Sequence, residues 1–483
     1  MAKLSPGLGQ PDIITRKAKQ EWQRLCDSYL PVRDRASIWR FSRNRRCGDP
    51  TQGWKLHVSA TILSACEIFR VVAPYLKQRG IMFKAPRSLA ELHKLNAGIF
   101  YGFGQVGKFI TIYPPTPEVA QAIAPKLHRL TAKYRGPVIP YDNRLRSNSC
   151  VYYRYGAFLK RTMVFRGRRV EALVRPDGKR VPDLRKPKSA VPLWLSDPFG
   201  PPPVRRGSLT PLETDYRDYE ALTQRGRGGI YRALDISSRR ARPCILKEGR
   251  RHGETDVLGR DGFYLVKQEA RFLKSNADKV SGLPRVIATF CADDCFYLVM
   301  EHIAGRSLHQ VLASPERISL HRLLTYCANM SRVVAEIHAA GWAWHDCKPA
   351  NFLCQSGGNL RPIDFDGACP LRMLDLWPVG TEGYIEVTSR KRPPLPEQAD
   401  LHALGVSLAQ VTTRTAAVSK IAATFSRKAK EQRLPGPLIE TIQSLLESQP
   451  RSRPSARTVH GVLKELLATP LLAIQCRKRR RKA

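Results

Sequence analysis

The sequence predicts an α+β protein with two folded domains, and three observations support this prediction. A chain of 483 residues is longer than one hydrophobic core usually supports. Its hydrophobic fraction of 42% is high enough to bury such cores. A stretch rich in Pro and basic residues, from Arg175 to Pro211, separates two segments with strand-like and helix-like patterns, and its composition is typical of a linker.

In the first segment, strands and helices alternate. Strand-like alternation occurs over 54–61, 81–85 and 108–114, and helical spacing of apolar residues over 62–80 and 116–134. Pro74 should bend or interrupt the first helix, whereas Thr116-Pro117 is a typical helix start. In the second segment, strands over 244–249 and 295–303 precede helices over 323–341, 399–413 and 458–470.

The net charge indicates an anionic binding partner but does not identify which kind. Lys and Arg number 81 against 41 acidic residues, which gives a formal charge of +40. Such a field attracts nucleic acid, anionic membrane, acidic peptides or phosphorylated substrates. The basic run Arg477–Lys482 is a further candidate for nucleic acid, although a solvated tail is the simpler interpretation, so nucleic acid is not the favoured partner.

Cysteine spacing indicates a reducing compartment, and hydropathy indicates a protein without a membrane span. The 12 cysteines form no Cys-x-x-Cys array of metal-binding spacing, so no zinc is expected. A chain of this length needs no disulfide scaffold. No apolar run reaches the roughly 18 residues of a membrane span, and the first residues lack the apolar core of a signal peptide. We therefore expect a cytoplasmic protein with no transmembrane segment.

The stretch "WHDCKPANFLCQSGGNLRPIDFDGAC", from Trp344 to Cys369, carries the groups that phosphoryl transfer requires. Asp346 is placed to orient a substrate hydroxyl and Lys348 to face the transferring phosphate. Asn351 and Asp364 follow at spacings suited to holding Mg²⁺.

These residues and their order make the region from Asp215 to about Leu467 resemble a Ser/Thr protein kinase, which implies a two-lobed fold that uses ATP and Mg²⁺. By that resemblance, Lys247 binds the α- and β-phosphates and Glu269 is its helix partner. The backbone of Glu301 and Ile303 contacts adenine. The glycine-rich loop is formed by Gly226, Gly228 and Gly229.

Four departures from the kinase pattern bear on regulation. The glycine-rich loop is about two residues short, Trp344 replaces a His, His345 replaces an Arg, and Asp366 replaces a Gly. Arg453 lacks its usual carboxylate unless Glu386 or Glu382 supplies one. None of these changes removes a predicted metal ligand, the acceptor carboxylate or the phosphate lysine. They argue against an activation-loop switch more than against catalysis.

The stretches "GWKLHVSAT", "GIMFKAPRS", "GQVGKFITIYP" and "VYYRYGAF" resemble the N-terminal lyase domain of class III/IV lanthipeptide synthetases, which is related to phosphothreonine lyases. That family phosphorylates Ser or Thr of a peptide and then eliminates the phosphate to give dehydroamino acids. The resemblance implies that Lys84 is the base and His57 the acid. It implies a phosphate pocket made of Lys55, Lys108, Arg144 and Arg154.

The chemistry of elimination agrees with these residue types. A lysine becomes a base where positive neighbours depress its pKa, a histidine can donate a proton, and Lys and Arg hold a phosphate dianion. Lys55 lies on the same strand face as His57, because residues two apart in a strand point the same way. Arg146 competes with Arg144 for its role, Tyr155 is an orienting or a packing residue, and Val106 stands where the lyases have a tyrosine.

The predicted organisation is an N-terminal extension over 1–50, a lyase-like domain over 51–165, a linker over 166–214, a kinase-like domain over 215–468 and a basic tail over 469–483. Synthetases of this class continue into a cyclase, so a separate cyclase is an expected partner beside the peptide or protein substrate. Two other readings remain: a signalling kinase whose front domain binds phosphopeptides, and a pseudokinase scaffold.

Overall fold

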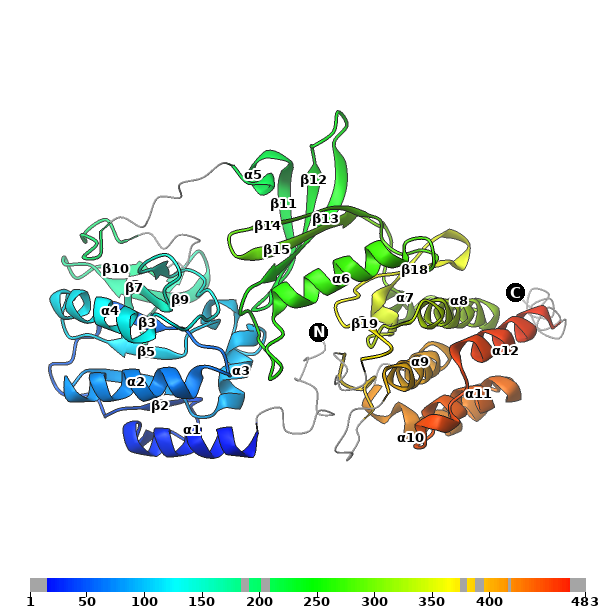
Figure 1. Ribbon diagram of the computed structural model, residues 1–483, viewed down its shortest axis with the longest axis horizontal. Helices are drawn as coiled ribbons and strands as arrows, with labels where there is room; N and C mark the ends of the chain where they lie inside the picture. The colour runs from blue at the N-terminus through cyan, green and yellow to red at the C-terminus, as the bar shows by residue number, and fades with distance from the viewer. Residues whose placement is uncertain are drawn as a thin grey trace.

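The computed structural model describes residues 15–183, 191–200, 209–373, 380–386, 395–415 and 418–469. It contains a front domain, up to residue 200, and a two-lobed domain, from residue 209. The front domain lies beside the small lobe of the second domain, and the large lobe lies on the opposite side (Figure 1). The prediction of a mixed α and β chain with two domains is confirmed.

A seven-stranded antiparallel sheet with the order β1-β2-β4-β5-β3-β7-β6 forms the centre of the front domain. Its strands are β1 (Val32–Arg33), β2 (Trp39–Phe41), β3 (Gln52–Val58), β4 (Met82–Pro86), β5 (Ile110–Tyr113), β6 (Asn143–Arg144) and β7 (Val151–Ala157). A separate three-stranded sheet consists of β8 (Thr162–Phe165), β9 (Arg168–Val174) and β10 (Arg180–Pro182).

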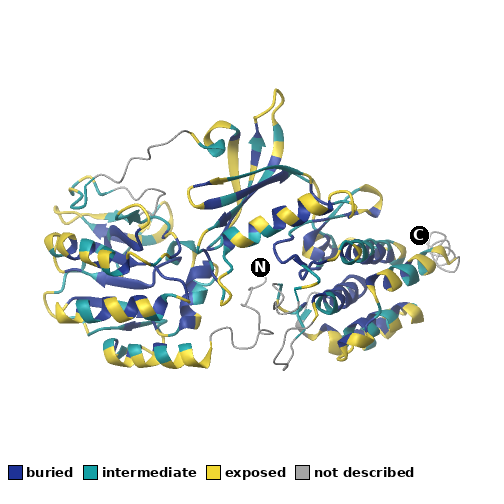
Figure 2. Cartoon of the chain, in the orientation of Figure 1, coloured by how far each residue is buried: buried dark blue, intermediate teal, exposed yellow. Residues whose placement is uncertain are grey.

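Helices cover one face of the seven-stranded sheet. They are α1 (Arg16–Tyr29), α2 (Ala65–Gln78) and α4 (Pro117–Thr131), while α3 (Leu89–Ala97) and the short η1 (Phe103–Gln105) lie at its edge. Their apolar sides and the inward strand residues form one core, which includes Trp22, Phe69, Phe83 and Phe109. Figure 2 shows the alternation of buried and exposed residues on these helices. The opposite face of the sheet is left for polar side chains.

Helix α2 runs from Ala65 to Gln78, so Pro74 does not interrupt it. A proline in a helix removes the hydrogen bond to the carbonyl four residues earlier. That residue is Arg70, which is exposed, so water can satisfy the freed carbonyl. Helix α4 begins as predicted, because the Thr116 side chain accepts a hydrogen bond from Val119 N and Pro117 occupies the first turn.

The front domain extends beyond the predicted boundaries on both sides. Residues from α1 to β2 belong to its sheet and core, because β2 pairs with β4 and Trp22 of α1 packs on Phe69. On the other side, β9 and β10 lie within the predicted linker. Phe199 also packs on Tyr153, with ring centroids 4.2 Å apart. Residues 184–190 and 201–208 of the linker and 470–483 of the basic tail lie outside the described residues.

The two-lobed domain has a five-stranded small lobe and a helical large lobe. The small lobe, of order β11-β12-β13-β15-β14, contains α5 (Pro211–Thr214), β11 (Tyr216–Arg225), β12 (Gly228–Asp235), β13 (Arg242–Arg250), α6 (Gly262–Asn276), β14 (Val286–Ala292) and β15 (Cys295–Glu301). The large lobe contains α7 (Leu308–Leu312), α8 (Leu320–Ala339), β16 (Trp342–Ala343), η2 (Pro349–Asn351), β17 (Phe352–Cys354), β18 (Leu360–Pro362), β19 (Cys369–Pro370), α9 (Pro396–Thr413), α10 (Ile421–Glu431), α11 (Gly436–Leu446) and α12 (Ala456–Ala468). Among the described residues, no helix is both long and apolar enough to cross a membrane.

The turn between β11 and β12 contacts the front domain directly. Gly226 N donates a hydrogen bond of 2.9 Å to the Ala97 carbonyl at the end of α3. A Cβ at Gly226 would overlap the Asn96 carbonyl oxygen, so only glycine fits this approach. Beside it, the Arg250 guanidinium lies 4.9 Å from the centre of the Phe103 ring of η1. The glycine-rich turn is therefore part of the domain junction.

We predict that Gly226→Val detaches this turn from α3. The new side chain must displace the Asn96 backbone, and overpacking of this kind usually costs about 1–3 kcal/mol. Hydrogen exchange over residues 223–230 should become faster. Gly461→Ala is the matched control, because a Cβ there meets open space within α12. Unchanged exchange in Gly226→Val would contradict the junction.

Candidate active sites

The first candidate site is a cavity of about 200 Å³ on the polar face of the front-domain sheet. Four of the predicted lyase residues line it from two strands, β3 and β4, and from the turn before β5: Lys55, His57, Lys84 and Lys108. Arg154 of β7 lines it as well. Further lining residues that the sequence did not single out are Thr111, Tyr113, Lys160, Arg161 and Glu171.

Strand register brings these side chains together. Thr111 of β5 is the cross-strand partner of both His57 on β3 and Lys84 on β4. Lys55 pairs with Arg154 of β7 in the same way. Because side chains alternate along a strand, Leu56 points into the core, and Lys55 and His57 on either side of it point to the other face.

Lys84 has the properties of a base. Burial lowers its pKa to about 8, and the positive charge of Lys108 acts in the same direction. A substantial fraction of this amine is thus neutral near pH 7 to 8. The Lys84 nitrogen lies 4.2 Å from the ring centre of Trp39 on β2, which fixes the position of the side chain.

His57 is held by a carboxylate. Its Nδ1 lies 2.5 Å from Oδ2 of Asp142, and both side chains are buried. Burial lowers the pKa of His57 to about 4, although Asp142 opposes this shift, so the ring is neutral at pH 7. A phosphate dianion bound beside the ring would favour its protonated form. Asp142 also lies 3.8 Å from the Lys108 amine.

Two more basic side chains of the cavity are Lys55 and Arg154. Burial lowers the pKa of Lys55 to about 7, and the charges of Arg154 and Lys84 contribute. The Arg154 guanidinium donates two hydrogen bonds of 2.6 Å to Asp183, just after β10. These bonds tie the segment after β10 to β7.

Three other predicted residues lie elsewhere. Arg144 is outside the cavity, because its guanidinium bonds the Tyr152 hydroxyl at 2.9 Å and lies 4.0 Å from Asp294 of the small lobe. Tyr155 packs edge-on against Trp54. Val106 is buried and contributes no hydroxyl where the lyases have a tyrosine, whereas Tyr113 does line the cavity.

The second candidate site lies in the two-lobed domain. The Lys247 amine on β13 forms ion pairs with Glu269 of α6, at 2.6 Å, and with Asp364. Phe365 N donates to the same Glu269 carboxylate at 3.0 Å. Burial alone would raise the pKa of Asp364, but Lys247 and Lys348 lower it well below its usual range. The predicted phosphate lysine, its helix partner and a predicted metal ligand are therefore in contact.

Asp346 is the centre of a hydrogen-bond network. Its carboxylate accepts from the Lys348 amine at 2.5 Å, from Thr381 Oγ1 at 2.8 Å and from Asn351 Nδ2 at 2.9 Å. Burial raises the pKa of Asp346, while Lys348 opposes this shift. Because Asn351 donates through its nitrogen, its amide oxygen is directed away from Asp346.

Trp344 does more than fill space. Its indole N–H donates to the Asp364 carbonyl at 2.8 Å, and its ring stacks on Phe365 with centroids 4.8 Å apart. Phe365 in turn stacks on Phe272 of α6. Trp344 therefore joins its own loop to the segment that carries Asp364 and, through Phe365, to α6. Burial lowers the pKa of the His345 ring below its ordinary value.

Asp366 forms an ion pair that the sequence did not reveal. Its carboxylate lies 3.1 Å from the guanidinium of Arg227, at the tip of the glycine-rich turn. Both residues line a cleft of about 170 Å³ with Gly228, Gly229 and Lys247. The Arg227–Asp366 pair thus holds the glycine-rich turn over the cleft. In the large lobe, Glu386 lies 3.1 Å from Arg453 and supplies the expected carboxylate.

Glu301 and Ile303, which are predicted to contact adenine, lie at the end of β15 and just after it. Glu301 ends β15, and its carboxylate pairs with Arg361 at 2.6 Å. Ile303 follows it and is half-buried. For Mg²⁺, Asp364 and Asn351 offer hard oxygen ligands, which suit an ion that takes its other ligands from phosphates and water. In the part of the chain that the structure describes, no cluster of three or more His, Cys, Asp or Glu side chains forms a metal site.

Comparisons with known proteins give a family match for each of the two domains. The family described as "RamC, N-terminal domain" matches residues 21–207, and the family described as "Protein kinase domain" matches residues 237–466. The chain carries a RamC N-terminal domain and a protein kinase domain. The two resemblances that the sequence predicted are confirmed.

Individual relatives cover one or both domains. The chain is 29% identical over 377 residues to a "Probable SapB synthase" of Streptomyces coelicolor, which covers 74% of this chain and 40% of that protein. It is 26% identical to "Serine/threonine-protein kinase F" of a Synechocystis species over 51% of this chain and 54% of that protein. It is 34% identical to "Serine/threonine-protein kinase PknA" of Mycobacterium tuberculosis over 23% of this chain and 26% of that protein. The chain spans less than two thirds of the length of each relative.

We predict that Asp366→Gly, which restores the residue usual in kinases, weakens ATP binding. Without the carboxylate, Arg227 no longer holds the glycine-rich turn closed, and loss of a partly exposed ion pair should raise the KM for ATP about fivefold. Initial-rate kinetics of phosphorylation measure this effect. Glu220→Ala, which breaks an exposed ion pair on β11, is the matched control. An unchanged KM in Asp366→Gly would refute the role of the pair.

We predict that Asp142→Asn impairs the predicted elimination without impairing the kinase domain. The amide cannot hold His57 in the same tautomer, so kcat for phosphate release from a phosphopeptide should fall by about 10² or more, with little change in KM. The pH dependence of kcat should shift as well. ATP-dependent phosphorylation serves as the test of folding, and an equal loss of both activities would indicate a structural role only.

Proposed function

We propose that the chain is a bifunctional dehydratase of the lanthipeptide type. Its kinase domain phosphorylates Ser or Thr of a peptide or protein, and its RamC domain eliminates the phosphate to leave a dehydroamino acid. The observation that carries this proposal is the cavity of the RamC domain. It brings a lysine of lowered pKa, a carboxylate-held histidine and further cations to one face of a sheet.

The kinase step uses the contacts around Asp346. The substrate hydroxyl takes a place beside this carboxylate, which accepts its proton as the new O–P bond forms and the bond between the γ-phosphorus and ADP breaks. Lys348, already 2.5 Å from Asp346, stabilises the charge on the transferring group. Lys247 holds the other phosphates of ATP. Asn351 and Asp364 would hold the Mg²⁺ that neutralises the phosphate charge.

The elimination step uses Lys84 and His57. The neutral amine of Lys84 removes the α-proton of the phosphorylated residue, the Cβ–O bond breaks, and its electron pair departs with the phosphate as the Cα=Cβ bond forms. His57 gives its proton to the leaving phosphate oxygen. Lys55, Lys108 and Arg154 hold the phosphate. Arg144 has no role in this step, because its guanidinium donates to the Tyr152 hydroxyl.

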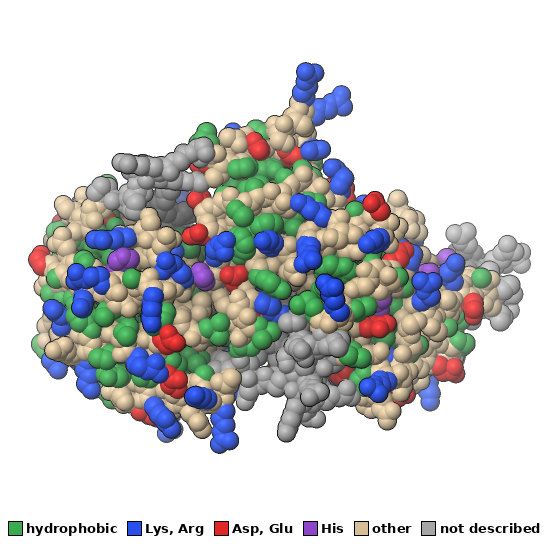
Figure 3. All heavy atoms as spheres, viewed as in Figure 1, with side chains coloured by type: hydrophobic (Ala, Val, Ile, Leu, Met, Phe, Trp, Pro, Cys, Tyr) green, Lys and Arg blue, Asp and Glu red, His purple; other side chains and the backbone are tan. Residues whose placement is uncertain are grey.

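Similarity supports the same assignment. The relative named as a probable SapB synthase matches 74% of this chain, through both domains rather than one. A dehydroamino acid is the electrophile to which a thiol adds, so a separate cyclase would act on the product. Lys and Arg side chains are spread over the visible face of both domains and form no single stripe there, which favours a peptide substrate over nucleic acid (Figure 3).

The alternatives explain less of the structure. A front domain that only binds phosphopeptides has no need of the lowered pKa of Lys84 or of the His57–Asp142 pair. A pseudokinase scaffold has no need of the complete contact between Lys247, Glu269 and Asp364.

We predict that Lys84→Ala and Asp346→Asn stop the reaction at different stages. With ATP, Mg²⁺ and a Ser/Thr peptide, Lys84→Ala should accumulate phosphopeptide, because the base is missing, whereas Asp346→Asn should leave the peptide unmodified. Intact-mass spectrometry distinguishes a gain of phosphate from a loss of water. A stable phosphopeptide with the wild-type chain would favour a signalling kinase, and failure to bind ATP would favour a scaffold.

A further inference from the structure

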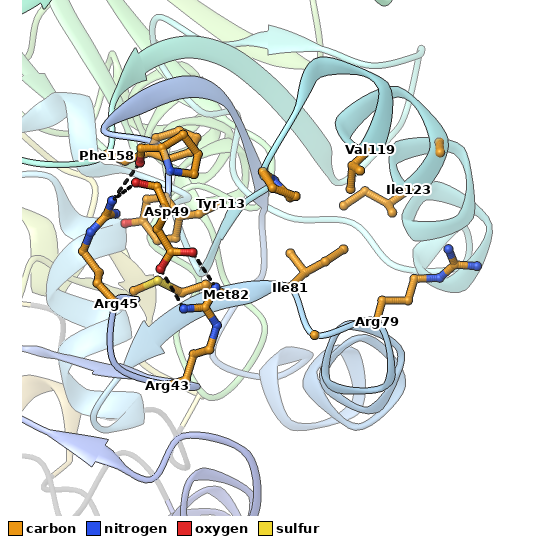
Figure 4. Close-up of a pocket in the computed structure, with 14 residues that line it drawn as sticks. Arg43, Arg45, Asp49, Arg79, Ile81, Met82, Tyr113, Val119, Ile123 and Phe158 are labelled. Atoms are coloured by element: carbon orange, nitrogen blue, oxygen red, sulfur yellow. Dashed lines mark hydrogen bonds and ion pairs between the residues drawn. The ribbon is translucent and has the colours of Figure 1, made fainter. Parts of the chain in front are cut away.

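A second cavity, of about 290 Å³, lies beside the phosphate cavity of the RamC domain (Figure 4). The two cavities share two lining residues, Tyr113 of β5 and Phe158, which follows β7. Their rings meet edge-on with centroids 5.1 Å apart. Two aromatic rings are therefore the wall between the cavities, and a group bound in one lies close to a group bound in the other.

One part of the wall of this second cavity is apolar. Ile81, just before β4, faces Val119 and Ile123 of α4 across the cavity, and Met82 lies toward its other end (Figure 4). Ile81, Met82 and Ile123 are buried, so their side chains are fixed by the core behind them. This apolar part of the wall gains by covering an aliphatic or aromatic group.

Charged side chains lie at the two ends of the cavity. At one end, Arg43 donates to the Asp49 carboxylate at 2.7 and 2.9 Å, so the two charges compensate each other. Arg45 donates to the carbonyls of Asp49 and Pro50. These contacts fix the segment that borders the cavity. Arg79 lies at the opposite end, where its guanidinium is 5.0 Å from the ring centre of Tyr75.

We propose that this cavity is a specificity subsite that binds an apolar side chain of the phosphopeptide. The side chain belongs to a residue within two positions of the phosphorylated one. An extended peptide rises about 3.3 Å per residue, and side chains two apart point the same way, so it can span the Tyr113–Phe158 wall. This inference rests on the proposed function, because it places the phosphate of the same peptide beside Lys55 and Lys108.

The test compares two synthetic phosphopeptides that differ only in Leu or Asn at one flanking position, scanned from two before to two after the phosphorylated residue. They are titrated against the full chain with Lys84→Ala, which prevents turnover. At one position the Leu peptide should bind about tenfold more tightly, as is typical for an apolar pocket. Ala122→Trp, at the exposed rim of the cavity on α4, should abolish this difference and leave the Kd of the Asn peptide unchanged.

Lys126→Trp is the matched control, because Lys126 is exposed on the same helix and does not line the cavity. It should retain the preference for Leu. Equal affinity for Leu and Asn at all four positions would overturn the subsite, as would an equal effect of Ala122→Trp on both peptides. Phosphate release by the wild-type chain tests the proposed function separately. If the wild-type chain prefers the Leu peptide but releases no phosphate, elimination is contradicted and the subsite is still supported.

Discussion

The register of β3 against β5 and β7 is the constraint on which the RamC domain depends. Side chains alternate along a strand, so a shift of one residue would move Lys55 and His57 into the core and Leu56 to the cavity. The cost of burying these polar groups fixes the register. The same pairing that builds the core therefore also assembles the cavity.

The two candidate active sites differ in how their charged side chains are arranged. In the RamC domain, burial and, to a smaller extent, neighbouring cations lower the pKa of Lys55 and Lys84. In the kinase domain, carboxylates are balanced by Lys247 and Lys348, and Arg227 is added from the glycine-rich turn. Neither arrangement needs a phosphorylated side chain of the protein to complete it.

Much of the fold and part of the site could be predicted from the sequence, because periodicity reports on which face a residue occupies. Lys55 and His57 were placed together by alternation alone. Asp142 was not found, because it lies in a connection without periodicity before β6. The strands β1 and β2 were missed because two or three residues give no pattern. The Arg227–Asp366 pair joins segments far apart in sequence, which no local signal reveals.

The contact of Gly226 with the end of α3 has a consequence for the order of folding. Domains fold as units during synthesis, with the N-terminal one first. The RamC domain can therefore present the Ala97 carbonyl before the β11–β12 hairpin leaves the ribosome. The hairpin of the small lobe would then complete its structure on a surface that already exists, which makes the first domain an intramolecular template for the second.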